Sequence, residues 1–314
     1  KLSNTAKILY GIYAGLTLLQ VISLLLCKMP IFDSIVLSLA TAGTGGFGIL
    51  NDSFVSYSTS AQLVTTIFMI IFGVNFNVYY YLLIKDFKAA FKCEEARWYF
   101  GIIIVSVLLI AFNITSMFNS FFEALKHAFF NVGSVITTTG FASHDFNTWP
   151  EFSKTILLIL MFIGACAGST GGGIKVSRIV IMLKDFKNTV DHYVFPRKIK
   201  HVFFEGKALN NDLVYSIRSY ISIYFFLFFI SLLLISLNNL DFSTNFSAVA
   251  ACFNNIGPAF GLAGPMSNYN CFNYFSKIVL IFDMLAGRLE LIPILILFSL
   301  ANNRRKQVKA IEDE

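Results

Sequence analysis

The sequence is poor in charged residues and in catalytic motifs, and each shortage excludes a class of protein. Only 13% of its 314 residues are charged and 56% are hydrophobic, whereas soluble domains carry roughly 25% charged residues. The five cysteines are scattered without a CxxC pair, so neither a disulfide framework nor a zinc site is indicated. No HExxH motif, Walker motif or nucleophile–base pair supports a membrane enzyme or an ATPase. The composition predicts an integral membrane protein that is not an enzyme.

Long apolar runs supply the length that a bilayer requires. A helix needs about 20 apolar residues to cross the hydrocarbon core. Shorter apolar segments of about a dozen residues follow the first, third and fifth long runs; they are too short to cross, and each leads into a glycine-bearing loop. The six predicted spans cover residues 6–27, 59–83, 98–118, 152–183, 213–237 and 272–300.

Basic residues indicate how the chain is oriented. Lysine and arginine gather before the first span, between the second and third, between the fourth and fifth, and after the sixth. Because cytoplasmic segments carry the excess of these residues, both ends of this chain are predicted to be cytoplasmic, and the short segments enter from outside. The net charge of +6 reflects this bias. Nucleic-acid binding is the weaker interpretation, because the basic residues flank spans.

The three pairs of spans follow one plan of span, short re-entrant helix, polar loop and span. Their loops read TAGTGGFG, ITTTGFAS and FNNIGPAFG, anchored by Gly46, Gly140 and Gly257. Irregular backbone at membrane depth is tolerated only where it is buried in protein or lines a water-filled cavity. Carbonyls turned toward one axis can replace the water shell of a cation, and no loop holds a lysine or arginine. Ordinary external turns would explain one such loop, but less readily three at matching positions.

A second glycine cluster, CAGSTGGGIK, interrupts the fourth span. It is not a P-loop, because an isoleucine separates the last glycine from the lysine and no serine or threonine comes directly after that lysine. A helix broken at mid-membrane must place its freed backbone groups on a water-filled path. Close helix packing is the alternative, since Gly164 and Gly168 have GxxxG spacing. Three consecutive glycines, however, break a helix.

Other polar residues in the predicted spans carry local expectations. Ser169 and Thr170 are expected to bond the amides of their own loop, and Lys175 is expected to reach the cytoplasmic surface. Three asparagines are expected to be hydrogen-bond partners between helices rather than ion ligands. They are Asn75, Asn77 and Asn113.

Arg288 lies near the middle of the sixth span, where a charge costs about 2.5 to 3.5 kcal/mol on insertion scales. It should therefore face water or a partner. A salt bridge to another span, for instance to Asp283, is one interpretation; Glu290 points to a different face of the same helix. These two acids are the only ones well inside a span. A cation-coupled secondary transporter with discontinuous helices, which usually buries such acids, remains the alternative function.

The motifs TTTGF, NNIGP, AGSTGGGIK and GRLEL occur in this order within the repeated plan. Together they resemble the TrkH-type membrane subunits of the Trk/Ktr/HKT potassium transporter superfamily, over nearly the whole chain. The resemblance implies four such units around a pseudo-four-fold pore, of which three are present here as repeats two to four. We therefore expect the native protein to be longer at its N-terminus. The first filter loop, which bears on selectivity for potassium over sodium, is not in this sequence.

The resemblance also implies roles for individual residues. Potassium ions would bind at the filter loops, and the glycine cluster would form an intramembrane gate loop beneath them. Arg288 would act with that loop as a positive barrier to cations, and the chain would bind no cofactor. The implied filter residues are Thr44, Gly45, Gly46, Thr138, Thr139, Gly140, Asn255, Ile256 and Gly257, and the implied gate residues are Gly168, Ser169, Thr170, Gly171, Gly172, Gly173 and Arg288.

The predicted fold is an all-α integral membrane protein of repeated units. The resemblance implies a homodimer in the bacterial inner membrane, with a cytosolic nucleotide-binding regulatory subunit like TrkA. The basic linker Lys187–Asn211 and the tail after Ala301 would dock that subunit; attraction to anionic lipid is the alternative for the linker. The predicted units are residues 1–96 with filter loop 43–47, residues 97–205 with filter loop 137–141 and gate loop 164–173, residues 206–302 with filter loop 254–258, and the cytoplasmic tail 303–314.

Overall fold

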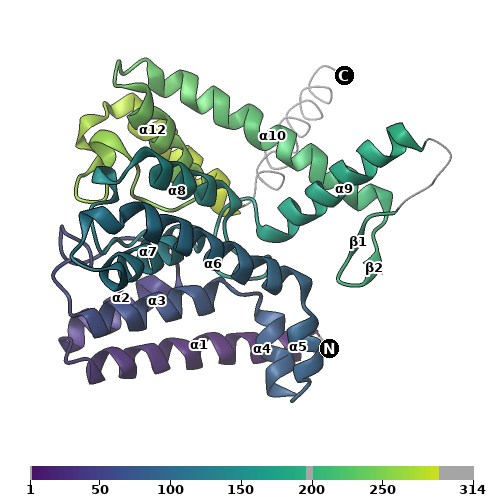
Figure 1. The fold of residues 1–314 in the computed structure, drawn as a ribbon, viewed down its shortest axis with the longest axis horizontal. Helices are drawn as coiled ribbons and strands as arrows, with labels where there is room; N and C mark the ends of the chain where they lie inside the picture. The colour runs from purple at the N-terminus through teal and green to yellow at the C-terminus, as the bar shows by residue number, and fades with distance from the viewer. Residues whose placement is uncertain (1, 196–200, 290–314) are drawn as a thin grey trace, which may run out of the picture.

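The computed structural model describes residues 2–195 and 201–289, and this part of the chain is almost entirely helical (Figure 1). Long helices lie side by side along the horizontal axis of the view, with the first unit at the bottom and the third at the top. The first unit comprises α1 (Leu2–Leu26), α2 (Ile31–Ala42), α3 (Thr59–Gly73) and α4 (Phe76–Leu83).

The second and third units follow the same order of long helix, short helix and closing helix. The short helix α5 (Phe87–Lys92) links the first unit to the second, which comprises α6 (Glu94–Ile114), α7 (Phe121–Ile136), α8 (Glu151–Ile163) and α9 (Val176–Val194). A hairpin of β1 (Phe203–Phe204) and β2 (Lys207–Ala208) leads to α10 (Asn211–Ser236), α11 (Phe242–Phe253) and α12 (Tyr274–Leu289). Short 3-10 turns are η1 (Thr115–Met117), η2 (Phe146–Thr148), η3 (Gly261–Ala263) and η4 (Tyr269–Cys271).

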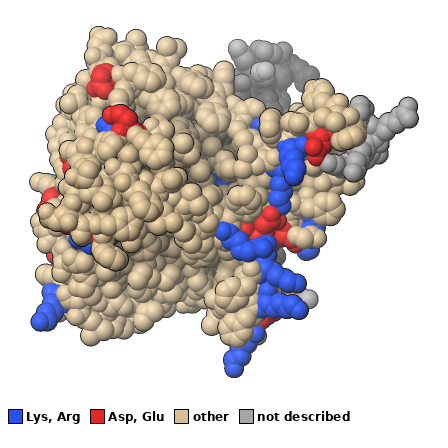
Figure 2. Space-filling view, viewed as in Figure 1, with Lys and Arg blue, Asp and Glu red and all other residues tan. Residues whose placement is uncertain are grey.

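Burial is arranged as a membrane protein requires. Large apolar side chains on the long helices are exposed, for example Leu18, Ile104 and Phe226. The interior includes most of the short helices α7 and α11, and residues 248–251 of α11 are fully buried. Figure 2 shows a broad uncharged surface, with lysine and arginine gathered at the end of the molecule that carries α4, α5 and α9. Apolar surface on this scale fits a lipid environment rather than water.

Three helices in the described part of the chain are long and apolar enough to cross a membrane, at residues 7–26, 94–117 and 211–236. The predicted span over 59–83 is broken by a bend that was not predicted: α3 and α4 together are apolar enough to cross, but they meet at an angle of 92°. The local cause is Asn75, whose side chain accepts a bond from the Asn77 N–H and so caps a new helix. The end of the sixth predicted span lies outside the described residues.

The fourth predicted span is interrupted where the sequence indicates. Helix α8 ends at Ile163, irregular backbone follows, and α9 begins at Val176. The two re-entrant helices α7 and α11 begin at side-chain caps, Ser120 and Asp241. Hydrogen bonds from the hydroxyl and N–H of Thr244 hold the pKa of Asp241 below its usual value. These caps anchor the outer ends of the short helices, so that their carboxyl ends point into the protein.

Candidate functional site

The short helices α2, α7 and α11 end in the same hydrogen-bonded turn. In each, the second amide past the C-cap bonds back to the carbonyl five residues earlier, which is the Schellman arrangement. The negative end of each helix dipole therefore faces the loop that follows. The three bonds are Gly45 N–H to Ala40 O at 2.7 Å, Thr139 N–H to Ser134 O at 2.9 Å, and Ile256 N–H to Ala251 O at 2.8 Å.

Backbone conformation also repeats through the three predicted filter loops. The second residue of each loop is left-handed without being glycine, and a glycine with positive φ follows two positions later. Such non-glycine residues cost about 1 to 3 kcal/mol, and persist where the surroundings enforce them. The sequence named these threonines and the asparagine as filter residues along with the glycines, but it did not predict their left-handed backbone conformation. The φ values are 51° and 75° for Thr44 and Gly46, 56° and 89° for Thr138 and Gly140, and 58° and 104° for Asn255 and Gly257.

The three loops meet backbone to backbone. A Cβ added to Gly46 would lie 2.4 Å from the Thr139 carbonyl oxygen and 2.6 Å from that of Ile256. A Cβ added to Gly140 would lie 1.7 Å from the Ile256 oxygen. The structure thus brings together residues from all three repeats, with carbonyl oxygens at the point of contact. Only residues without a side chain fit at Gly46 and Gly140.

Cavities lie on two sides of this meeting point. One, of about 530 Å³, is lined by the glycines Gly46, Gly140 and Gly257 together with Tyr269. The Tyr269 hydroxyl donates a hydrogen bond of 2.5 Å to the Gly257 carbonyl. The other, of about 650 Å³, is lined by the predicted gate loop and Arg288. The filter glycines thus line one space, and the gate loop lines the other.

The predicted gate loop touches the inner end of each short helix. The Gly172 N–H donates to Thr138 Oγ1 at 2.6 Å, beyond α7. A Cβ on Gly172 would lie 2.4 Å from the Asn254 oxygen at the end of α11. Thr44 Oγ1, beyond α2, donates to the Thr170 carbonyl at 3.1 Å. The loop therefore lies directly beneath all three filter loops.

Arg288 joins the gate loop to the end of α2. Its guanidinium donates to the carbonyls of Gly43 at 2.9 Å and Thr170 at 3.1 Å, and to Thr44 Oγ1 at 3.1 Å. A cation is favoured at a helix carboxyl end. The alternative pairing with Asp283 is wrong, because that fully buried carboxylate accepts a bond from Ser231 Oγ at 2.6 Å. Glu290 lies outside the described residues.

The break between α3 and α4 pairs with the gate loop, which sequence reasoning missed. The Cys166 N–H donates to the Gly73 carbonyl at 3.0 Å, and the Phe76 N–H donates to the Gly168 carbonyl at 3.1 Å. Backbone groups freed at membrane depth must find partners inside the protein. Here the backbone groups freed at one interrupted helix form hydrogen bonds with those freed at the other. The only local signal was the asparagine cap at Asn75.

The local expectations for the gate loop are met in part. Ser169 Oγ accepts from the Gly171 N–H at 3.3 Å, as predicted. Thr170 Oγ1 instead donates to the Phe72 carbonyl at 3.4 Å. Lys175 does not extend to the surface as predicted, because its Nζ donates to the Gly171 carbonyl. The loop is braced by its own side chains and by α3.

Two of the three asparagines make the predicted bonds between helices. Asn113 Oδ1 in α6 accepts from Ser153 Oγ in α8 at 2.7 Å. Asn75 Nδ2 donates to Glu95 Oε2 in α6 at 3.2 Å. Glu95 itself was missed: two acids before an apolar run are typical of a helix start, and nothing local shows that Glu95 faces inward. It is buried, with 3% of its surface exposed.

Known proteins share this chain's sequence and fold. A family model named TrkH and described as a cation transport protein matches residues 1–309. The Trk system potassium uptake protein TrkH of Salmonella typhimurium is 33% identical over 306 residues, covering 95% of this chain and 62% of that protein. The TrkH of Vibrio parahaemolyticus is 34% identical over 307 residues, with the same coverage of 95% and 62%.

A solved structure confirms the predicted helical membrane fold. The crystal structure of the potassium transporter TrkH from Vibrio parahaemolyticus superposes with a TM-score of 0.87 at 32% identity, over 94% of this chain and 64% of that one. The chain thus spans somewhat under two thirds of the length of the relatives it matches. By sequence over nearly its whole length and by structure, the chain belongs to the TrkH family of cation transport proteins.

Proposed function

We propose that this chain forms most of the conduction pathway of a potassium-uptake protein. The observation that carries the proposal is the meeting of three equivalent loops, at which Gly46 and Gly140 approach the carbonyls of Thr139 and Ile256. Carbonyl oxygens at close quarters replace the hydration shell of a cation. Three helix dipoles direct their negative ends to the same place. The relatives named above carry potassium uptake in their names.

In this proposal the filter consists of the backbone of loops 43–47, 137–141 and 254–258. The native protein supplies a fourth loop from a preceding repeat and completes a pseudo-four-fold ring. A second copy of the protein forms a homodimer in the bacterial inner membrane, with both ends of this chain cytoplasmic. The protein is a transporter rather than an enzyme, and potassium is its cargo with no cofactor bound.

The gate is assigned to the loop 164–173 and Arg288. The loop lines one of the two cavities, and its contacts with Thr138, Asn254 and Thr44 hold it under the filter. The arginine adds a positive charge at the same level, which repels cations. This arrangement is a closed state, and conduction requires the loop to leave its place.

A cytosolic nucleotide-binding subunit like TrkA is the proposed source of that movement. The basic linker from Lys187 to Asn211 is its proposed docking site, with α9 and the hairpin at the same end of the molecule (Figure 1). The tail after Ala301, which the sequence also assigned to docking, lies outside the described residues.

Rubidium uptake into liposomes that contain the complete native protein together with its proposed cytosolic subunit tests the function. We expect concentrative uptake driven by membrane potential alone, reduced by unlabelled potassium and less by sodium. Uptake that requires an imposed proton or sodium gradient would instead support the coupled transporter that the sequence left open. The same vesicles without protein give the background.

Thr138 offers an isosteric test of the closed gate. Replacing Thr138 with valine removes the acceptor for the Gly172 N–H and preserves the side-chain shape. An unpaired buried donor costs about 1 to 3 kcal/mol, so the closed arrangement weakens and basal rubidium flux rises several-fold. Thr138→Ser retains the hydroxyl and should conduct like the native protein. Equal flux in both variants would remove Thr138 from the gate.

A further inference from the structure

Glu95 is a buried carboxylate that lies between the gate loop and α9. Its Oε1 accepts from the Ala167 N–H at 2.6 Å, within the gate loop, and from the Ser177 N–H at 3.1 Å, in the first turn of α9. Its Oε2 accepts from Asn75 Nδ2 at 3.2 Å, at the break between α3 and α4. One side chain therefore holds three segments that meet around the interruption of the fourth span.

The chemistry of these contacts suits a carboxylate. The first amides of a helix have no partner within the helix, and they carry partial positive charge. Glu95 lies in the first turn of α6 and also bonds the first turn of α9, so both helix dipoles stabilise its negative charge. Hydrogen bonds to an ionised acceptor are about twice as strong as neutral ones. Without Glu95, the amides of Ala167 and Ser177 lose this acceptor.

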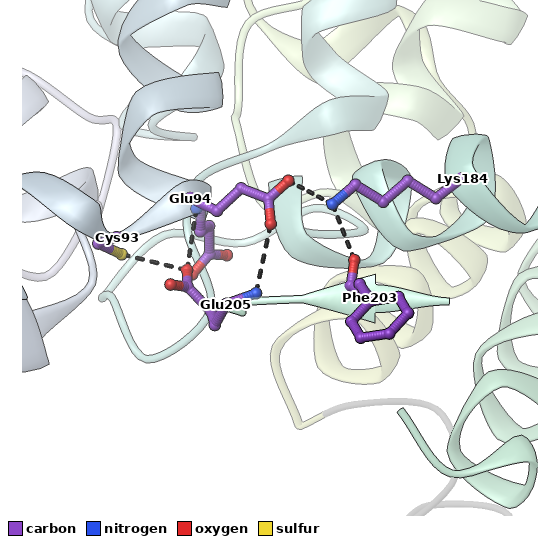
Figure 3. Close-up of polar contacts among 6 residues, drawn as sticks. Cys93, Glu94, Lys184, Phe203 and Glu205 are labelled. Atoms are coloured by element: carbon purple, nitrogen blue, oxygen red, sulfur yellow. Dashed lines mark hydrogen bonds and ion pairs between the residues drawn. The ribbon is translucent and has the colours of Figure 1, made fainter. Parts of the chain in front are cut away.

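The exposed hairpin β1–β2 is hydrogen-bonded to the N-terminal end of α6, where Glu95 lies, as Figure 3 shows. Glu205, at the hairpin turn, accepts the backbone N–H of Glu95 at 3.0 Å. The Glu205 N–H in turn donates to Glu94 Oε2 at 3.3 Å. Glu94 pairs with Lys184 of α9, whose Nζ also donates to the Phe203 carbonyl at 2.8 Å. The hairpin is thus tied to α6 and to α9 at the point where Glu95 reaches the gate loop.

We propose that Glu95 is a positioning residue that latches the gate loop closed, and that Glu205 of the hairpin sets the position of this latch. The proposal rests on the gate assigned under the proposed function. Moving the hairpin moves the start of α6, which withdraws the Glu95 carboxylate from the Ala167 and Ser177 amides. The hairpin lies at the end of the molecule where lysine and arginine gather (Figure 1 and Figure 2), and it is exposed at its turn. Displacement of the hairpin then reaches the gate loop through α6 and Glu95, although no hydrogen bond joins the described hairpin residues to the gate loop itself.

Hydrogen exchange and rubidium flux on the complete native protein in liposomes test the latch separately from the gate. Glu95→Gln keeps the shape and removes the charge. We expect exchange of the Ala167 and Ser177 amides to accelerate about ten-fold, and basal flux to rise by a similar factor, since charge-assisted bonds are lost. Glu95→Asp retains the charge on a shorter side chain and guards against a folding defect; it should give smaller increases in both.

Glu205→Gln tests the link to the hairpin. It should accelerate exchange at the same two amides, and the double variant with Glu95→Gln should add nothing to Glu95→Gln alone, because both act along one path. Asp185→Asn is the control: it removes a carboxylate of α9 that pairs with Arg218 at 2.6 Å and that, in the described part of the chain, makes no bond to the gate loop, Glu95 or the hairpin. It should change neither readout.

The possible outcomes separate the two proposals. Unchanged exchange at Ala167 and Ser177 in Glu95→Gln would overturn the latch. Accelerated exchange in Glu95→Gln with none in Glu205→Gln would overturn the link to the hairpin. Accelerated exchange in both with unchanged flux would leave the latch standing and overturn the gate on which it was built.

Discussion

Gly140→Ala is expected to abolish potassium uptake while the protein still folds and inserts. The glycine has φ of 89°, and an added methyl group would lie 1.7 Å from the Ile256 carbonyl oxygen. Side chains at positive φ cost about 1 to 2 kcal/mol, and the overlap forces the opposing carbonyl away from its place. If conduction loses about 3 kcal/mol of ion stabilisation, flux falls roughly 100-fold, since each ~1.4 kcal/mol is a factor of ten.

Rubidium uptake in liposomes, with the proposed cytosolic subunit present so that the native protein conducts, measures this effect, beside size-exclusion chromatography and a melting curve of the purified protein. Gly101→Ala is the matched control, because no atom lies within 4 Å of a Cβ at Gly101 in α6. It should transport normally and be at least as stable, since alanine favours helix over glycine by about 1 kcal/mol. Native uptake by Gly140→Ala would mean that ions do not pass the meeting point of the loops.

Arg288→Ala is expected to produce the opposite effect, a protein that conducts without its regulator. The substitution removes a positive charge and three hydrogen bonds, to Gly43, Thr44 and Thr170. A hydrogen bond to a charged group contributes about 1.5 to 3 kcal/mol. If the closed state loses the stabilisation of even one of these hydrogen bonds, basal rubidium flux rises about ten-fold or more. The flux assay is run without any cytosolic subunit, where the native protein should be nearly silent.

Two further arginine variants show whether charge or hydrogen bonding explains the raised flux of Arg288→Ala. Arg288→Lys keeps the charge but loses the planar fork that reaches several acceptors at once; flux near the native level would identify charge as the barrier, and high flux would identify bracing of the loop. Arg218→Ala removes an exposed ion pair with Asp185, which is worth at most about 1 kcal/mol, and should not open the pore. Unchanged or lower flux in folded Arg288→Ala would remove this arginine from the gate.

Local features of the sequence predicted most of the helical plan. Apolar runs and short helices ending at glycine loops recur three times, because span length and helix termination depend on neighbouring residues. The interruption of the fourth span was visible for the same reason, since consecutive glycines disfavour helix wherever they occur. The bend in the second span was not predicted: the asparagine cap at which α4 begins is a weak signal inside a strongly apolar run.

Contacts between distant segments decided the rest. The pairing of Gly73 and Phe76 with the gate loop, the three acceptors of Arg288 and the inward position of Glu95 all join residues far apart in the chain. Hydropathy and motif spacing indicate whether a residue favours a helix or a loop. They do not indicate which distant polar group its side chain or backbone will bond.

The sequence by itself therefore determined the membrane class, the repeated helices and the positions of the glycine loops. The tertiary structure alone decided which backbone groups pair across those interruptions. The physical reason is that polar groups at membrane depth have no water to bond, so their partners are chosen by how the units pack together.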